Sequence, residues 1–136
     1  MKVINILLVD DDHLDALDIA RSLDKMQIIY KMNIARNGEE AIRLLEENDE
    51  SGTPYPDLLL IDLNMPRMNG LELLQVLRNS VKWQQLKCFV ITTSEEWEDK
   101  KAARDLGISG YIVKPLKLNN PSSIDAFNLM IDLMNM

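Results

Sequence analysis

Four side chains suited to phosphoryl chemistry each stand at the end of a short apolar run: Asp11, Asp62, Thr92 and Lys114. The runs cover residues 4–9, 58–61, 88–91 and 111–113. In an open parallel α/β sheet the functional crevice lies outside the carboxyl ends of the strands, so these four residues are expected to converge on one pocket. Their spacings of 51, 30 and 22 residues, each ending on a strand terminus, are difficult to obtain by chance. The set therefore predicts a magnesium-dependent phosphoacceptor site.

Carboxylates would supply both the metal ligands and the nucleophile of this site. Asp10, Asp11 and Asp62 offer hard oxygen ligands, and Mg²⁺ binds through one or two carboxylates together with waters and a phosphate. Asp62 follows a strand in a sharp turn that should expose its carboxylate, which can attack phosphorus to give an aspartyl phosphate. Lys114 supplies a compact cation for one phosphoryl oxygen, and the Thr92 hydroxyl can donate to another.

Each of these residues, taken alone, also has a purely structural explanation. Three adjacent aspartates usually form a solvated turn or a helix N-cap, and Asp12 is expected to cap the helix that follows. His13 could in principle relay a phosphoryl group, but its place beside three aspartates at a helix start favours a solvated side chain. The phosphoacceptor prediction therefore depends on the combination of residues.

Composition limits the chain to one domain and excludes several functions. With 136 residues, of which 46% are apolar, the chain can bury one core and has no room for a second. A net charge of −7 argues against nucleic-acid binding, which calls for clustered Lys and Arg. The start, MKVINILLVDDD, has too short an apolar run for a signal peptide, and no stretch approaches the roughly 18 apolar residues of a membrane span. We therefore expect a cytoplasmic protein that binds neither nucleic acid nor membrane.

Short apolar runs alternate with amphipathic stretches along the whole chain, which is typical of βαβ units. Strands are predicted at 4–9, 30–35, 58–61, 88–91 and 111–113. Helices are predicted at 13–27, 39–48, 71–79, from 97 to a stop at Gly107, and at 123–134, with a loop at 49–56. The apolar positions of the first helix are Leu14, Leu17, Ile19, Ala20 and Leu23. Strict alternation predicts a doubly wound α/β/α sandwich with helices on both faces.

Four motifs together resemble the receiver domain of two-component response regulators, and the resemblance spans residues 3–134. ILLVDDD is similar to the acidic pair of that family, LLLIDLNMPRMNG to its phosphorylation turn, VITTS to its switch Thr or Ser, and GYIVKP to its Lys-Pro pair. The resemblance implies a flavodoxin-like (βα)5 fold with a five-stranded parallel sheet in the order 2-1-3-4-5. Residues 1–136 would form a single receiver domain.

The resemblance also implies roles for the acidic residues. Asp62 would be the phosphoacceptor and a ligand of Mg²⁺ or Mn²⁺. Asp11 would bind the metal directly, Asp10 largely through water, and Asn64 through its backbone carbonyl.

Further implied roles concern the phosphoryl group and the switch. Lys114 would bind the phosphoryl group, with a cis peptide expected before Pro115. Thr92 would move toward the phosphate, and Tyr111 would turn inward on activation. Asn64 and Ser94 stand where the family tunes hydrolysis.

In this family the phosphoryl donor is a phosphohistidine on a sensor histidine kinase or a phosphotransfer protein. The domain catalyses transfer to itself, from that donor or from small phosphodonors, and slow dephosphorylation, so we do not expect an enzyme with a separate substrate. The phosphorylated chain would present a changed surface, made of the fourth helix, fifth strand and fifth helix, to a downstream protein.

Two segments depart from a generic receiver. Residues 46–57, EENDESGTPYPD, form a longer segment than the typical family loop, and with the absence of an output domain this is similar to small regulators that partner phytochrome-type or other hybrid histidine kinases. The C-terminal helix, within residues 121–136, has more apolar residues than one core-facing stripe needs. Its excess apolar surface could dock a second copy or a partner, which would make a homodimer through this helix and the face beside it.

Two other functions are considered. As a phosphate sink or phosphorelay intermediate, the chain would pass the phosphoryl group from Asp62 to another histidine protein without binding a target. A phosphotransfer enzyme of the haloacid dehalogenase type expects DxDx[TV] after the first strand, whereas this chain has DDDHL and lacks the Thr or Val. The short flanks favour a complete gene product over an excised domain.

Overall fold

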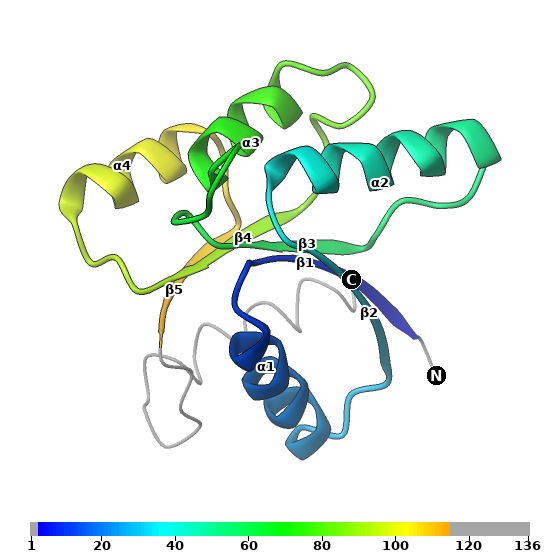
Figure 1. The fold of residues 1–136 in the computed structure, drawn as a ribbon, viewed down its shortest axis with the longest axis horizontal. Coiled ribbons are helices and arrows are strands. Elements are labelled where there is room, and N and C mark those ends of the chain that lie inside the picture. Colours follow the sequence, from blue (N-terminus) through cyan, green and yellow to red (C-terminus); the bar gives the residue numbers. More distant parts are fainter. Residues whose placement is uncertain (1–2, 115–136) are drawn as a thin grey trace.

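Five parallel strands form one sheet in the order β2-β1-β3-β4-β5, which confirms the predicted topology (Figure 1). The strands are β1 (Ile4–Val9), β2 (Tyr30–Ala35), β3 (Leu58–Ile61), β4 (Cys88–Thr92) and β5 (Gly110–Val113). Two strands are one residue longer than predicted, because Thr92 belongs to β4 and Gly110 to β5. Thr92 therefore ends a strand and does not begin the loop after it.

A computed structural model describes residues 3–114 of the chain. The helices in this range are α1 (His13–Lys25), α2 (Gly38–Ser51), α3 (Gly70–Arg78) and α4 (Trp97–Asp105). The predicted C-terminal helix, its apolar surface and the expected cis peptide before Pro115 lie outside the described residues. Within the described range, no helix is long and apolar enough to cross a membrane.

The helices cover both faces of the sheet, with α1 on one side and α2, α3 and α4 on the other (Figure 1). Successive side chains of a strand point to opposite faces, so each strand contributes to both cores. In β1, Leu7 and Val9 pack in the core with α2, α3 and α4, whereas Ile6 and Leu8 pack in the core with α1. Because both faces are buried, the central strands are continuous apolar runs.

The register of the sheet brings the carboxyl ends of β1 and β3 side by side. Val9 pairs with Ile61, so the residues that follow them, Asp10 and Asp62, are neighbours across the two strands. The Asp62 N–H donates to the Val9 carbonyl at 2.9 Å. On the far side of β3, the Lys114 N–H donates to the carbonyl of the last β4 residue at 2.7 Å. Three strands therefore deliver polar side chains to one edge of the sheet.

The first helix is shorter than predicted and buries only part of its apolar positions. It ends at Lys25 because Gln27 has a φ of 60°, in the left-handed region that an α-helix excludes. Two of the apolar positions, Leu14 and Leu17, are 62% and 45% exposed. The buried positions are Ala16, Ile19, Ser22 and Leu23. One stripe of the helix faces the sheet, and the two leucines lie beside that stripe.

The second helix is longer than predicted and occupies part of the expected loop. It covers Gly38–Ser51, whereas the sequence predicted a helix at 39–48 and a loop from 49 onward. The helix ends where Gly52 has a φ of 69°, a left-handed conformation that glycine adopts at little cost. The position of this glycine, rather than the polar composition before it, decides where the loop begins.

A tight turn between β3 and α3 fixes the segment that follows Asp62. The Asn69 side chain accepts from the Glu72 N–H at 3.0 Å, and the Glu72 carboxylate accepts from the Asn69 N–H at 3.2 Å, which forms a capping box. Gly70 starts α3 so close to the preceding chain that an added Cβ would lie 2.3 Å from the Asp62 carbonyl oxygen and 2.7 Å from the Leu63 Cα. Only glycine fits at this contact.

Replacing Gly70 with alanine is expected to lower the free energy of unfolding by about 3 kcal/mol, because the added methyl group meets backbone atoms that cannot move aside. Gly52→Asn is the control: nothing lies within 4 Å of its Cβ position, and asparagine tolerates the left-handed φ. Equilibrium urea unfolding measures both changes. Equal stability of Gly70→Ala and the parent chain would contradict the steric explanation.

Candidate functional site

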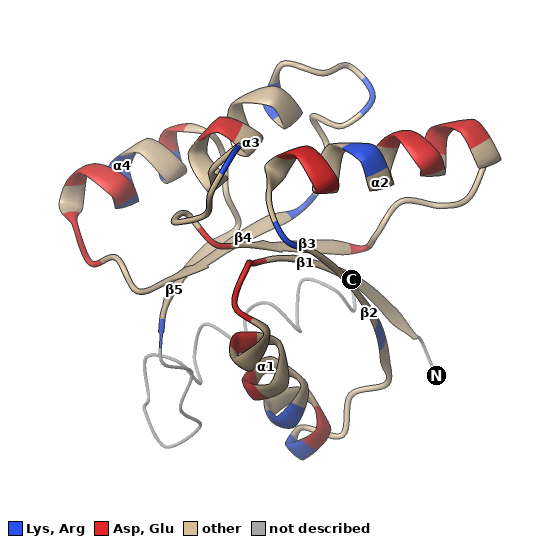
Figure 2. Ribbon diagram, in the orientation of Figure 1, with Lys and Arg blue, Asp and Glu red and all other residues tan. Residues whose placement is uncertain are grey.

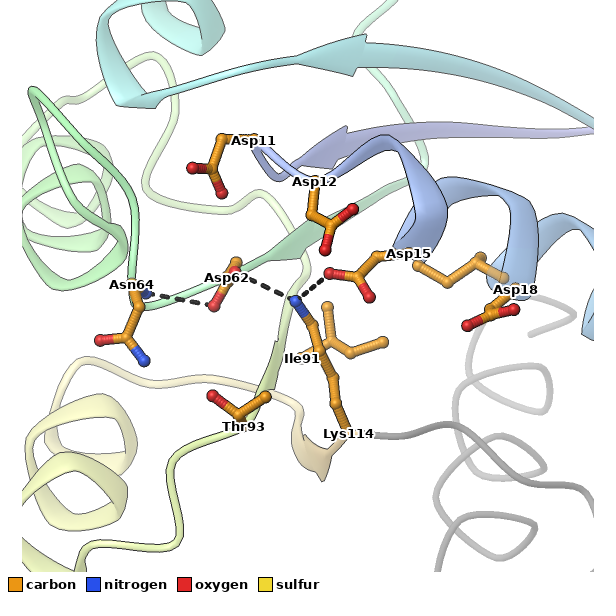
Figure 3. Close-up of a pocket in the computed structure, with 10 residues that line it drawn as sticks. Asp11, Asp12, Asp15, Asp18, Asp62, Asn64, Ile91, Thr93 and Lys114 are labelled. Carbon is orange, nitrogen blue, oxygen red and sulfur yellow. Dashed lines mark hydrogen bonds and ion pairs between the residues drawn. The ribbon is translucent and has the colours of Figure 1, made fainter.

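Three carboxylates meet where β1 and β3 end. The loop after β1 and the first turn of α1 are acidic (Figure 2). Asp10 and Asp11 follow β1, Asp62 follows β3, and one carboxylate oxygen of each lies within 4.8 Å of the others. Asp10 and Asp62 are buried, whereas Asp11 is exposed and faces the same pocket as Asp62 (Figure 3). Carboxylate oxygens are ligands that Mg²⁺ prefers, so this donor set fits a hard divalent cation.

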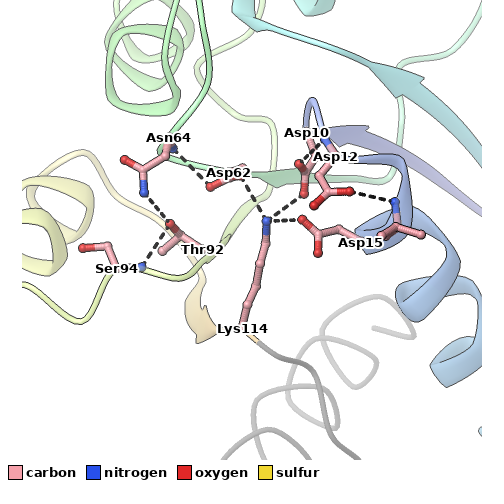
Figure 4. Close-up of polar contacts among 9 residues, drawn as sticks. Asp10, Asp12, Asp15, Asp62, Asn64, Thr92, Ser94 and Lys114 are labelled. Carbon is pink, nitrogen blue, oxygen red and sulfur yellow. Dashed lines mark hydrogen bonds and ion pairs between the residues drawn. The ribbon is translucent and has the colours of Figure 1, made fainter.

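Lys114, the residue after β5, places its ammonium among these carboxylates. Its Nζ lies 2.9 Å from Asp10 Oδ2 and 3.0 Å from Asp62 Oδ2 (Figure 4). The same atom also contacts Oδ2 of Asp15, in the first turn of α1. Only 10% of the lysine side chain is exposed. One buried cation therefore joins the ends of β1, β3 and β5 to α1.

Burial and charge shift the pKa values of these groups. Burial raises the pKa of Asp10 to about 7, although the Asp12 N–H, at 2.9 Å, and the Lys114 ammonium both favour its charged form. For Lys114, burial opposes the charged form, but the hydrogen bonds to Asp15 and Asp10 and the charge of Asp62 outweigh burial and raise its pKa above the ordinary value. Lys114 is thus a stable cation at neutral pH, whereas Asp10 is near the midpoint of its titration.

The Asp62 carboxylate faces the pocket but is largely covered. One oxygen accepts a hydrogen bond from the Asn64 N–H at 3.1 Å, and the other accepts from Lys114. Only 8% of the Asp62 side chain is exposed, so the expectation that the turn exposes this carboxylate was wrong. The reason is a tertiary contact. Lys114 follows a strand much later in the chain, 52 residues after Asp62, and its ammonium lies against the Asp62 carboxylate.

Thr92 lies next to the site without lining the pocket. Its fully buried hydroxyl accepts hydrogen bonds from Asn64 Nδ2 at 3.4 Å and from the Ser94 N–H at 3.3 Å (Figure 4). The side chain that lines the pocket at this point is that of Thr93. Neighbouring residues of an extended chain point to opposite sides, so only one of the two threonines can face the pocket.

Hydrogen bonds continue from Thr92 to α4 and β5. Ser94 Oγ donates to Asp99 Oδ2 of α4 at 2.6 Å, and the Tyr111 hydroxyl donates to the Ser94 carbonyl at 2.9 Å. The Lys100 ammonium lies 5.8 Å from the centroid of the Tyr111 ring, within cation–π distance. The loop between β4 and α4 therefore connects the site with the outer surface of α4 and β5.

A cavity of about 360 Å³ lies beside these groups (Figure 3). Its polar lining includes Asp11, Asp15, Asp62, Asn64, Thr93 and Lys114. Asp15 is not among the site residues predicted from the sequence. A signal was present, because Asp15 comes three residues after the helix N-cap and helical side chains tilt back toward the N-terminus. That geometry directs its carboxylate to the acidic end of α1.

Two other polar residues at the start of α1, Asp12 and His13, have the local roles that the sequence predicted. Asp12 Oδ1 accepts from the Leu14 N–H at 2.9 Å, so Asp12 caps the helix as predicted. His13 is exposed at the first position of α1, as the solvated interpretation predicted.

Comparison with known proteins gives one family. A family model for the response regulator receiver domain matches residues 6–122. The chain is 30% identical over 116 residues to the response regulator Rcp1 of Synechocystis sp., and the match covers 85% of this chain and 79% of Rcp1.

Solved structures share the fold over nearly the whole chain. A two-component response regulator from Legionella pneumophila is 32% identical, with a TM-score of 0.79 and coverage of 98% of this chain and 99% of that one. The phosphorylated cyanobacterial phytochrome response regulator RcpA is 25% identical, with a TM-score of 0.75 and coverage of 98% and 91%. The Mn²⁺-bound form of Rcp1 is 26% identical in the aligned structure, with a TM-score of 0.73 and coverage of 96% and 89%.

Lys114→Met is expected to lower the free energy of unfolding at neutral pH by about 3 kcal/mol, because it leaves buried carboxylates without their cation. The loss should shrink toward about pH 5.5. Asp10, whose pKa in the folded protein is about 7, is mostly protonated at that pH, and a neutral carboxyl group does not need a neighbouring cation. Urea unfolding at the two pH values measures this change.

Lys101→Met is the matched control for that substitution. Lys101 and Asp105 form an exposed ion pair at 2.9 Å, with 55% and 63% of their side chains accessible. Exposed pairs of this kind contribute little, so the control should stay within about 0.5 kcal/mol of the parent chain. Similar losses in the two variants would contradict a stabilising role for the buried cation.

Proposed function

Because the chain belongs to the response regulator receiver domain family, a family of signalling domains, we propose that it is a single-domain response regulator that accepts a phosphoryl group on Asp62 from a histidine kinase. The observation that carries this proposal is the position of the Asp62 carboxylate. It lies 3.0 Å from the Lys114 ammonium and shares an edge of the sheet with Asp10 and Asp11. A carboxylate in this environment can serve as a nucleophile toward phosphorus.

We propose Mg²⁺, or Mn²⁺ in its place, as the cofactor. Asp10, Asp11 and Asp62 would hold it, with the Asn64 backbone carbonyl as a further ligand. When bound, the cation would offset the negative charge of the nucleophile and of the phosphoryl group. The hard oxygen donors of this chain and the Mn²⁺-bound form of the similar protein Rcp1 support this assignment.

In the proposed transfer, an Asp62 oxygen attacks the phosphorus of a phosphohistidine. The P–O bond to Asp62 forms as the P–N bond breaks, and the electron pair of that bond returns to the imidazole nitrogen, which takes up a proton from solvent. Lys114 can donate to a phosphoryl oxygen because its Nζ is already within hydrogen-bond distance of Asp62. Small phosphodonors would react in the same way, and water attack on phosphorus would later release phosphate.

Asn64 and Ser94 are proposed to tune that hydrolysis. Asn64 is exposed two residues after the phosphoacceptor, where its amide can affect how water approaches. Ser94 binds the same Thr92 hydroxyl as Asn64, so both residues border the reacting group.

Phosphorylation would act on the loop between β4 and α4. A phosphoryl group on Asp62 offers a charged acceptor to the Thr92 hydroxyl and would draw it away from Ser94. A shift of Ser94 would remove the carbonyl that the Tyr111 hydroxyl now contacts, which frees Tyr111 to change rotamer. The changed surface would be that of α4 and β5, where Trp97 is 68% exposed.

The proposed partners are one protein that donates the phosphoryl group and one protein that binds the phosphorylated chain. The donor would be a sensor histidine kinase or a phosphotransfer protein, and the target a downstream protein that binds the α4 and β5 surface. Similarity to the phytochrome response regulator RcpA supports a phytochrome-type or other hybrid kinase as the donor.

Incubation with acetyl phosphate and Mg²⁺ is expected to add one phosphoryl group to the native chain and none to Asp62→Asn, because the amide is a poor nucleophile. Intact mass spectrometry measures the gain, and chelation of Mg²⁺ should abolish it. Asp105→Asn, on the exposed face of α4, is the control and should gain the group at the parental rate. Equal labelling of the parent chain and Asp62→Asn would rule out Asp62 as the acceptor.

The affinity for Mg²⁺ is expected to fall as the pH drops below 7. Burial raises the pKa of Asp10 to about 7, and a protonated carboxyl group is a poor metal ligand. Binding should weaken by up to about tenfold per pH unit below pH 7, because each Mg²⁺ ion that binds would then displace one proton from Asp10. Isothermal titration calorimetry between about pH 6 and pH 8 measures the slope, and Asp10→Asn should flatten it. A parental affinity that does not vary over this range would contradict the raised pKa.

A further inference from the structure

Asp15 contacts the site lysine but has no part in the transfer described above. Its carboxylate and the Lys114 ammonium point toward one another across the pocket, from α1 and from the end of β5 (Figure 3). Asp15 does not belong to the group of three aspartates whose oxygens lie within 4.8 Å of one another. Its position suits contact with the lysine rather than with a metal ion.

The three hydrogen-bond partners of Lys114 behave differently during the reaction. A lysine ammonium has three N–H donors, and here they serve Asp10 at 2.9 Å, Asp62 at 3.0 Å and Asp15. Phosphorylation would convert Asp62 to an acyl phosphate without its carboxylate charge, and Asp10 would be one of the residues that hold the metal ion. Asp15 is the partner that would keep both its negative charge and its contact with the Lys114 ammonium throughout the reaction.

We propose that Asp15 is a positioning residue that holds Lys114 Nζ in the pocket while the lysine exchanges the Asp62 carboxylate for a phosphoryl oxygen. This inference rests on the proposed phosphoacceptor function of Asp62. The lysine has a flexible four-carbon stem, and a fixed anionic acceptor limits how far its ammonium can move when the other partners change.

The helix that carries Asp15 is firmly placed. The Asp15 N–H donates to the carbonyl of the N-cap residue Asp12 at 3.2 Å. Ala16 and Ile19, which follow on α1, are buried in the core beneath the sheet. The Asp15 side chain is 21% exposed, so solvent screens its contact with Lys114 only in part.

The test compares Asp15→Ala with Asp15→Asn. Asparagine keeps an acceptor oxygen at the same distance from the backbone, whereas alanine removes the acceptor. With saturating Mg²⁺ and acetyl phosphate, the initial rate of phosphoryl gain should fall about tenfold in Asp15→Ala and stay within about threefold of the parent in Asp15→Asn. Intact mass spectrometry over time measures the rates.

Asp24→Ala is the matched control. Asp24 lies near the C-terminal end of the same helix, is exposed, and is not among the residues that line the pocket. The substitution removes the same charge from α1 and should leave the rate within about twofold of the parent chain. The Mg²⁺ affinity of Asp15→Ala, measured by calorimetry, should match that of Asp24→Ala. If Asp15→Ala does not fold, Asp15→Ser replaces it, since the shorter side chain also cannot reach Lys114.

Four results would overturn the inference alone, provided that the parent chain is phosphorylated. They are a rate in Asp15→Ala equal to that of Asp24→Ala, equal losses in Asp15→Ala and Asp15→Asn, a faster rate in Asp15→Ala, and a loss of Mg²⁺ affinity specific to Asp15→Ala. Equal losses in Asp15→Ala and Asp15→Asn would indicate a general charge effect. A faster rate in Asp15→Ala would indicate that Asp15 competes for the lysine, and a specific loss of Mg²⁺ affinity would indicate that Asp15 is a metal ligand. No phosphoryl gain in the parent chain would overturn the proposed function as well.

Discussion

The buried ammonium of Lys114 is the interaction on which the arrangement of the site depends. The sheet register places Asp10 and Asp62 side by side, with little access to solvent, and two negative charges at short range repel each other. Lys114 compensates this charge, and its partners come from β1, β3 and α1. Removal of one member of a buried charged group leaves the others uncompensated, so these elements are held together as a unit.

The same charge balance supports the proposal that the site binds both a metal ion and a phosphoryl group. Of the described residues that line the pocket, Lys114 alone is cationic, against several carboxylates. A divalent cation would add the positive charge that the site lacks and would free the lysine for a phosphoryl oxygen. The hydrogen bonds from Thr92 through Ser94 to Tyr111 then offer a short physical connection between the reacting group and the surface of α4 and β5.

The fold was predictable because its requirements are local and repetitive. Strands buried on both faces must be apolar throughout, and helices between them need only one apolar stripe. The errors lay where one residue outweighed a general pattern. The left-handed backbone at Gln27 ended α1 early, and Gly52 set the end of α2 three residues later than the polar composition indicated.

The resemblance of the sequence to receiver domains implied the strand order. The sequence by itself determined the edge of the sheet where Asp11, Asp62 and Lys114 meet, since the carboxyl ends of parallel strands share one side. Only the tertiary structure decided which groups face the pocket there. It covered Asp62 and added Asp15, which contacts a lysine 99 residues away. These outcomes depend on side-chain direction and on contacts between distant segments, and local residue patterns contain neither.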